Sequence, residues 1–225
     1  MLLTPDAPIG QPSFQLSADE IATVVDLACR SAHEGRNQVH SGMLEVPITI
    51  VIRKAMRRLK KAEGITNLQI RGEHELEDMA TADPALLGRI DITLQFLRQF
   101  GDEDDYVAVE CKRVGAGHAT LNARYVSEGV DRFVTGQYSK GHAWAFMLAY
   151  VLALPVDQPI STINDRICQA YGQQAKLAAV STHAQALAIL SGSLVQCGAH
   201  IIRLQHIFVD MVSAAQNQRE PMARA

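Results

Sequence analysis

The sequence predicts an α/β protein in which a mixed central β-sheet is flanked by helices. Apolar residues recur at helical spacing before residue 64, strand-like alternation follows, and apolar residues make up 48% of the 225 positions. A chain of this length and composition buries a sizeable core and is too apolar to be disordered throughout. Because no internal repeat is present, we expect an N-terminal arm (1–16), one single domain (17–215) and a C-terminal tail (216–225).

Two helices are expected in the N-terminal third of the chain. Ser17 and Glu20 form an S-x-x-E capping box, which predicts a helix from there to about residue 33. A second helix is predicted over residues 44–62, where apolar residues repeat at helical spacing. The β-branched run 48–52 leaves a strand start possible at that point.

The periodicity then changes from helical to strand-like. A short strand is expected at residues 67–72, and two alternating segments follow at 88–94 and 106–112. The turn-rich acidic loop 100–105 joins the two alternating segments. This arrangement predicts an antiparallel hairpin.

The second half of the chain predicts further elements of both kinds. The expected elements are a helix at 121–134, a strand or buried helix segment at 143–152, a helix at 161–176 and a strand near 200–209. The histidines of this region show no H-x-x-x-H or H-E-x-x-H spacing. We therefore expect most of them to be structural or surface residues.

The predicted hairpin carries the residues best suited to chemistry. Glu110 and Lys112 are two positions apart, so they share one face of their strand, and Asp91 lies on the polar face of the other. If both polar faces point the same way, the three side chains converge. Two carboxylates can hold Mg²⁺ or Mn²⁺, which polarises a phosphate, and a neighbouring ammonium can orient the attacking water.

Part of this pattern resembles the signature of the PD-(D/E)xK nuclease superfamily: Ile90-Asp91 is followed downstream by Glu110-Cys111-Lys112. That group includes many restriction endonucleases, Holliday-junction resolvases and repair nucleases. The resemblance covers about residues 40–155 and implies a restriction-endonuclease-like fold with the signature on a hairpin of a mixed sheet. It implies that Asp91 and Glu110 bind the metal ion and that Lys112 is the catalytic lysine.

The resemblance also implies contributions from two helices. Many family members add a carboxylate from the helix before the sheet, and Glu45 is the best match because it shares the inward stripe of the second helix. The helix after Lys112 is implied to lie near the site. Residues there that would contact substrate are Gln137, Tyr138 and Lys140. Ile90 replaces the family's nominal proline, and Gly141 stands where the RecB-like branch has a tyrosine.

Six basic residues crowd the second predicted helix, and two interpretations of them remain open. They would fan over one broad face, opposite the stripe that holds Glu45. As a functional surface, this face would contact phosphate backbones without reading sequence. The residues assigned to that contact are Arg53, Arg57, Lys60 and Lys61. The alternative is a solvated face whose cations are favourable near the helix C-terminus.

The net charge, the cysteine spacing and the apolar stretches of the chain limit the classes of function that we expect. The formal net charge is −3, so any interaction with nucleic acid must rest on local charge. The four cysteines form no CxxC pair, which argues against a zinc ribbon and against a disulfide-rich secreted scaffold. No apolar leader opens the chain, and no stretch reaches the ~18–20 apolar residues that span a bilayer. We therefore expect a cytoplasmic location and no membrane partner.

Together these observations predict a Mg²⁺- or Mn²⁺-dependent nuclease that acts on DNA rather than RNA. The family suggests a nuclease subunit of a defence or repair system, with a partner subunit or a homodimer delivering the substrate. The alternative is an interaction or regulatory subunit that keeps the fold without catalysis, which the net negative charge favours.

Overall fold

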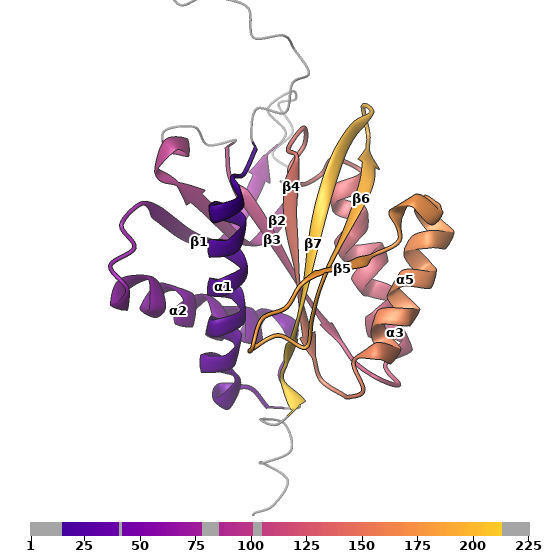
Figure 1. Ribbon diagram of the computed structural model, residues 1–225, viewed down its shortest axis with the longest axis horizontal. Helices are drawn as coiled ribbons and strands as arrows, with labels where there is room; N and C mark the ends of the chain where they lie inside the picture. The colour runs from indigo at the N-terminus through magenta and orange to yellow at the C-terminus, as the bar shows by residue number, and fades with distance from the viewer. Residues whose placement is uncertain (1–14, 41, 78–85, 101–104, 213–225) are drawn as a thin grey trace, which may run out of the picture.

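A computed structural model describes residues 15–40, 42–77, 86–100 and 105–212 (Figure 1). The strands are β1 (Leu68–Glu77), β2 (Leu86–Phe96), β3 (Val107–Val114), β4 (Trp144–Val151), β5 (Ala178–Ser181), β6 (Ala188–Gln196) and β7 (His200–Asp210). The helices are α1 (Ala18–Gly35), α2 (Glu45–Ala62), α3 (Ala119–Tyr125), α4 (Asp131–Val134) and α5 (Asp157–Tyr171). A π-helical segment (Val126–Val130) joins α3 to α4.

The seven strands form one mixed sheet in the order β1-β2-β3-β4-β7-β6-β5. β4 is parallel to both of its neighbours, β3 and β7, and the other four pairings are antiparallel. The predicted α/β class with a mixed central sheet and flanking helices is therefore confirmed. The predicted antiparallel hairpin is also present, as the pair β2–β3.

The helices α1 and α2 cover one face of the sheet. The predicted capping box is present, because Ser17 Oγ accepts from the Glu20 N–H while Glu20 Oε2 accepts from the Ser17 N–H. The apolar stripe of α2 is buried, with Ile48 and Ile52 fully covered. It packs in one core with α1 and with alternate side chains of β3, including Val109.

The opposite face of the sheet is covered by α3, α4 and α5 (Figure 1). Phe133 and Ile163 from these helices pack against Met147 and Phe208 of the central strands. Since both faces of β3 and β4 are covered, these strands are almost continuously buried. Residues 143–152, for which strand and buried helix were both open, thus contain the strand β4.

Two sequence predictions for the last third were wrong or incomplete. The predicted helix 161–176 instead begins at Asp157, with Pro159 in its first turn, where a missing N–H costs nothing. It ends at Gly172, whose φ of 90° only glycine adopts readily. The strands β5 and β6 were not predicted, because β6 contains a Ser-Gly-Ser sequence typical of turns.

Parts of the predicted arm (1–14), of the acidic loop (101–104) and all of the predicted tail (216–225) lie outside the described residues. Leu16, at the end of the predicted arm, is buried against the core beneath α1. Among the helices that the structure describes, none combines the length and the apolar character that crossing a membrane would require.

Candidate active site

The predicted convergence of the hairpin residues begins where β2 and β3 separate. The ladder between the two strands runs from Leu94↔Val107 to Ile92↔Val109 and then ends. At the next position Asp91 Oδ2 accepts a hydrogen bond of 2.8 Å from the Cys111 backbone N–H. The carboxylate thus replaces a backbone acceptor, which fixes Asp91 beside β3.

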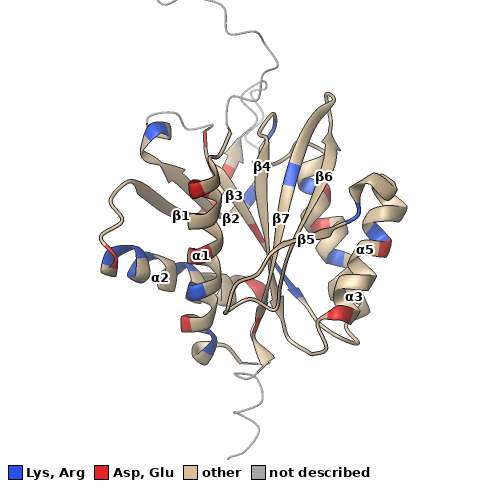
Figure 2. Cartoon of the chain, in the orientation of Figure 1, with Lys and Arg blue, Asp and Glu red and all other residues tan. Residues whose placement is uncertain are grey.

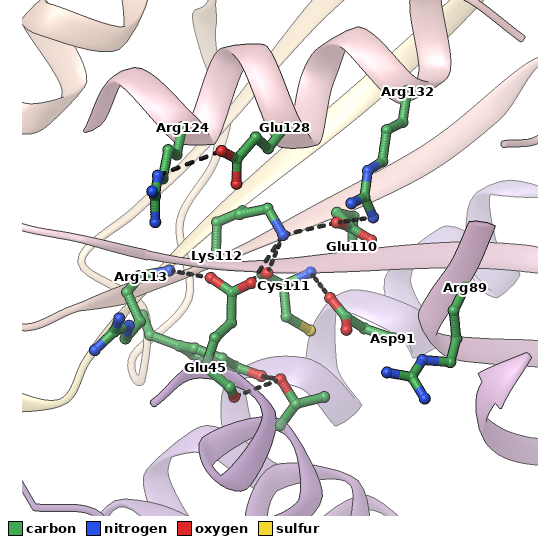
Figure 3. A network of polar contacts seen from close by, with 12 residues as sticks. Glu45, Arg89, Asp91, Glu110, Cys111, Lys112, Arg113, Arg124, Glu128 and Arg132 are labelled. Atoms are coloured by element: carbon green, nitrogen blue, oxygen red, sulfur yellow. Dashed lines mark hydrogen bonds and ion pairs between the residues drawn. The ribbon is translucent and has the colours of Figure 1, made fainter. Parts of the chain in front are cut away.

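Glu110 and Lys112 share one face of β3, as their spacing predicts, and they meet at its carboxyl end (Figure 3). Lys112 Nζ lies 2.8 Å from Glu110 Oε1 and 3.2 Å from the Cys111 carbonyl oxygen. The lysine stem passes Gly129 of the π-helical segment, where a Cβ would stand 3.4 Å from Lys112 Cγ and 2.7 Å from Met147 Cε. A glycine at this position therefore leaves room for the lysine.

Glu45 joins the cluster from the first residue of α2. Its Oε1 lies 2.8 Å from Lys112 Nζ, and its Oε2 accepts from the Arg113 backbone N–H at 3.1 Å. A carboxylate in the first turn of a helix is also stabilised by the helix dipole. The structure thus brings all four predicted catalytic residues together, from α2, β2 and β3.

Arg132 of α4 is a member of the cluster that sequence reasoning missed. Its Nη1 lies 3.0 Å from Glu110 Oε1, and it also donates to the Tyr138 hydroxyl. That hydroxyl in turn donates to the Arg89 carbonyl oxygen at 2.6 Å. The only indication of Arg132 in the sequence was that a cation stands on the helix predicted after Lys112, and many surface helices carry a cation. We call Glu45, Asp91, Glu110, Lys112 and Arg132 the carboxylate centre.

The pKa values of Glu110, Asp91 and Lys112 are all raised by their surroundings in the carboxylate centre. Burial raises the pKa of Glu110, and the Asp91 charge raises it further, against the opposing effect of Lys112. Burial also raises the pKa of Asp91, with Glu45 adding to the shift. Burial lowers the pKa of Lys112, but the surrounding carboxylates outweigh it and raise that pKa above its usual value, so the ammonium stays charged.

Carboxylate oxygens are the ligands that a hard divalent cation such as Mg²⁺ prefers. Glu110 Oε2 is buried and has no hydrogen-bond partner in the described part of the chain, although buried carboxylate oxygens are normally paired. When all three carboxylates are ionised, they outnumber the two cations, and negative charge is then in excess.

The described residues contain no group of three or more His, Cys, Asp or Glu side chains placed to hold a metal ion. A Mg²⁺ or Mn²⁺ ion would therefore have Asp91 and Glu110 as its side-chain ligands. Water and a backbone oxygen such as that of Cys111 would complete the shell, as is usual for Mg²⁺.

The carboxylate centre is reached from a cleft of about 240 Å³. Glu45, Lys112 and Arg113 line it on one side, and Arg124 and Glu128 of the opposite helices form an ion pair of 3.3 Å on the other. Lys112 itself is only 6% exposed. A substrate would thus approach Lys112 between α2 and α3.

The predicted substrate-contacting residues after α4 occupy different environments. Tyr138 is fully buried and supports Arg132, so it is not placed for direct contact with a substrate. The Gln137 side chain packs against Gly88 at the beginning of β2. Lys140 is exposed. Only Lys140 is therefore freely presented to solvent.

The basic residues of α2 are partly used within the molecule (Figure 2). Arg57 Nε donates to the Ile70 carbonyl oxygen at 3.1 Å, and Arg53 lies over Gly72, where any Cβ would collide with its guanidinium. These two arginines tie α2 to the sheet. Lys60 is half-buried and Lys61 is exposed, and neither forms an ion pair among the described residues.

The chain matches no protein-family model, no curated protein and no solved structure.

Proposed function

We propose that the chain is a metal-dependent nuclease with a restriction-endonuclease-like fold, which hydrolyses phosphodiester bonds of nucleic acid, DNA in preference to RNA. The observation that carries the proposal is the buried Glu110 Oε2 without a described partner, next to Asp91 and within the reach of Lys112. Phosphodiester hydrolysis needs such a combination of metal-binding oxygens and a fixed positive charge.

Each residue of the carboxylate centre has a role in this proposal. When bound, Mg²⁺ or Mn²⁺ supplies Lewis-acid polarisation of the phosphate and lowers the pKa of a coordinated water. Asp91 and Glu110 hold the ion. Lys112 stays protonated between two carboxylates, where it orients the attacking water and offsets charge on the phosphate. Glu45 and Arg132 are positioning residues, since they act on Lys112 and Glu110.

The proposed nucleic-acid contacts are electrostatic. Lys60, Lys61 and Lys140 would bind phosphates in a salt-dependent manner. Arg53, Arg57 and Gln137 would add to this surface only from positions that also hold the fold together. Since the net charge is −3, a partner subunit or a second copy in a defence or repair system would help to deliver substrate.

The test compares wild type with Asp91→Ala and Lys112→Ala on plasmid and on single-stranded DNA, with Mg²⁺, with Mn²⁺ and with EDTA. Metal-dependent cutting is expected, with a loss of at least about 100-fold in each variant, because each removes a group that acts on the transition state. Arg166→Ala is the control, since Arg166 is an exposed cation of α5 that is assigned to no substrate contact.

A non-catalytic binding subunit is the second candidate. It is favoured by the internal pairing of Lys112 and Arg132, which leaves neither cation without a carboxylate. Absence of cutting in every condition, together with no rise of the melting temperature in Mg²⁺ or Mn²⁺, would contradict the nuclease proposal. A metal-dependent rise of the melting temperature that disappears in Asp91→Ala would support the nuclease proposal, because a ligand that binds the folded state raises stability by mass action.

A further inference from the structure

A second, larger cavity of about 840 Å³ lies on the α1 face of the sheet, away from the carboxylate centre. Its floor consists of side chains of three neighbouring strands, β4, β7 and β6. These side chains are Trp144, Arg203, Gln205, Ser191 and Ser193. Its walls are α1 and the segment around residues 180–183. We call it the α1 cavity.

The α1 cavity lies at the beginning of β4, whereas the carboxylate centre lies toward its end. Lys112 is the register partner of Ala149, five residues after Trp144. At about 3.3 Å per residue, the two positions are separated by roughly 16 Å along the strands. The cavity is thus a separate site and does not extend the proposed active site.

The α1 cavity carries positive charge that the chain does not neutralise. Arg203 and Lys176 form no ion pair with any carboxylate that the structure describes. The Arg203 guanidinium lies over the Trp144 ring, 5.0 Å from its centroid. Asp26 is the only carboxylate among the described residues that line the cavity, and it already forms an ion pair of 3.0 Å with Arg30. An anion would therefore be attracted here.

Gln205 gives the floor a hydrogen-bonding group. Only 5% of the residue is exposed, and it lines the cavity. The amide both donates and accepts, and its register partner Ser191 adds a hydroxyl to the same floor.

The wall opposite these polar groups is apolar. Ile21, Ala22 and Val25 of α1 line one side, and Val180 lines the other. A cavity of this size with an apolar wall and a few convergent polar groups is typical of small-molecule sites, whose volumes are about 300–1,000 Å³. An apolar wall suits the face of a planar ring.

We propose that the α1 cavity binds a nucleoside monophosphate, with the phosphate at Arg203 and Lys176, the base against the α1 wall, and the base edge at Gln205. An inorganic anion would use the two cations but leave the apolar wall and the amide without a role. An apolar ligand would leave both cations unpaired. A ligand that is anionic at one end and planar at the other uses all three features.

The experiment exploits Trp144, the only tryptophan of the chain, which lines the cavity. AMP, GMP, CMP and UMP are titrated into the full chain in EDTA, with tryptophan fluorescence and calorimetry as readouts. Inorganic phosphate, ribose 5-phosphate and the four nucleosides are titrated in parallel. At least one nucleotide is expected to bind at least about tenfold tighter than each of these fragments.

Two variants locate the binding. Arg203→Gln and Gln205→Leu are each expected to weaken nucleotide binding by about tenfold, since one removes a charged donor and the other the amide. Arg71→Gln is the matched control, because Arg71 is an exposed strand arginine outside the cavity, and its guanidinium donates to the Gln69 side chain. Asp91→Ala is expected to bind nucleotide like wild type. This result separates the α1 cavity from the proposed nuclease, whatever the outcome for cutting.

Three results would overturn the proposal. The first is no change in fluorescence or heat with any nucleotide at roughly millimolar concentration. The second is phosphate or nucleoside alone binding as tightly as the nucleotide. The third is unchanged nucleotide affinity in Arg203→Gln. Because Arg203 is exposed at the cavity, this substitution is not expected to prevent folding.

Discussion

The carboxylate centre and the α1 cavity treat charge in opposite ways. In the carboxylate centre, three carboxylates surround Lys112 and Arg132, and every described cation has a carboxylate within 3.0 Å. In the α1 cavity, Arg203 and Lys176 have no such partner among the residues that the structure describes. Negative charge is in excess at the first site and positive charge at the second.

Burial makes this difference consequential. Glu110 is fully buried, so its charge interacts strongly with its neighbours and cannot be screened by solvent. Arg203 and Lys176 are exposed, and their charges are solvated. Removing a cation should therefore lower the stability of the fold at the first site and leave it almost unchanged at the second. A basic side chain therefore stabilises the fold where it is buried, and it is available to bind a ligand where it is exposed.

The largest effect is expected from removing the buried cation. Lys112→Met should lower the free energy of unfolding by about 3 kcal/mol at pH 8, because it leaves Glu110 and Glu45 without their shared partner. Urea unfolding followed by circular dichroism measures it. The loss should be smaller at pH 5, since the raised pKa of Glu110 allows that carboxyl to take up a proton.

The double variant Lys112→Met/Glu110→Gln is the control for this prediction. Neutralising Glu110 should restore much of the lost stability, because the penalty comes from a buried carboxylate that keeps only Arg132 as its partner and not from the missing lysine stem. Equal stability of the single and the double variant would show that the centre is held by packing and not by charge.

The buried imidazole of His206 shows how burial without an ion pair affects the charge of a side chain. It follows Gln205 in β7 but faces the opposite side, where its Nδ1 lies 2.8 Å from the Tyr125 hydroxyl. Burial lowers the pKa of His206 from 6.5 to about 3. The folded state therefore keeps it neutral while the unfolded chain becomes protonated, so stability is lost as pH falls from 6.5 toward 3.

His206→Asn retains an acceptor for Tyr125 but does not titrate. Relative to this variant, wild type should lose about 1.4 kcal/mol of stability per pH unit below pH 6, as measured by urea unfolding. Parallel pH profiles of the two proteins would contradict the assignment of a neutral buried imidazole. His200→Asn serves as the control for a general histidine effect, since His200 is only partly buried and lies at the beginning of the same strand.

The smallest effect is expected from the exposed cations of the α1 cavity. Lys176→Gln should change the free energy of unfolding by less than about 0.5 kcal/mol, because no described residue pairs with Lys176. Arg203→Gln should cost at most about 1 kcal/mol, which is the stacking on Trp144. Thermal melts measure both. A loss comparable to that of Lys112→Met would mean that these cations have a structural role.

The elements predicted best are those with a strong internal pattern. The capping box at Ser17 and the alternation in β2 and β3 depend on neighbours a few residues away, which the sequence displays directly. The beginning of α5 was missed although Pro159 lies in its first turn, where proline is tolerated. The strand β6 was missed because the turn signal of its Ser-Gly-Ser sequence was overridden by packing in the assembled sheet.

The sequence by itself determined the alternation of β3, and with it that Glu110 and Lys112 share a face, because the strand period of two leaves no choice. The tertiary structure decided that Asp91, Glu45 and Arg132 join them, since register and helix placement depend on contacts between residues 20 to 67 positions apart in the chain. It alone also created the α1 cavity, whose lining comes from α1 and strands distant in sequence. Contacts of that range arise only when the sheet is assembled.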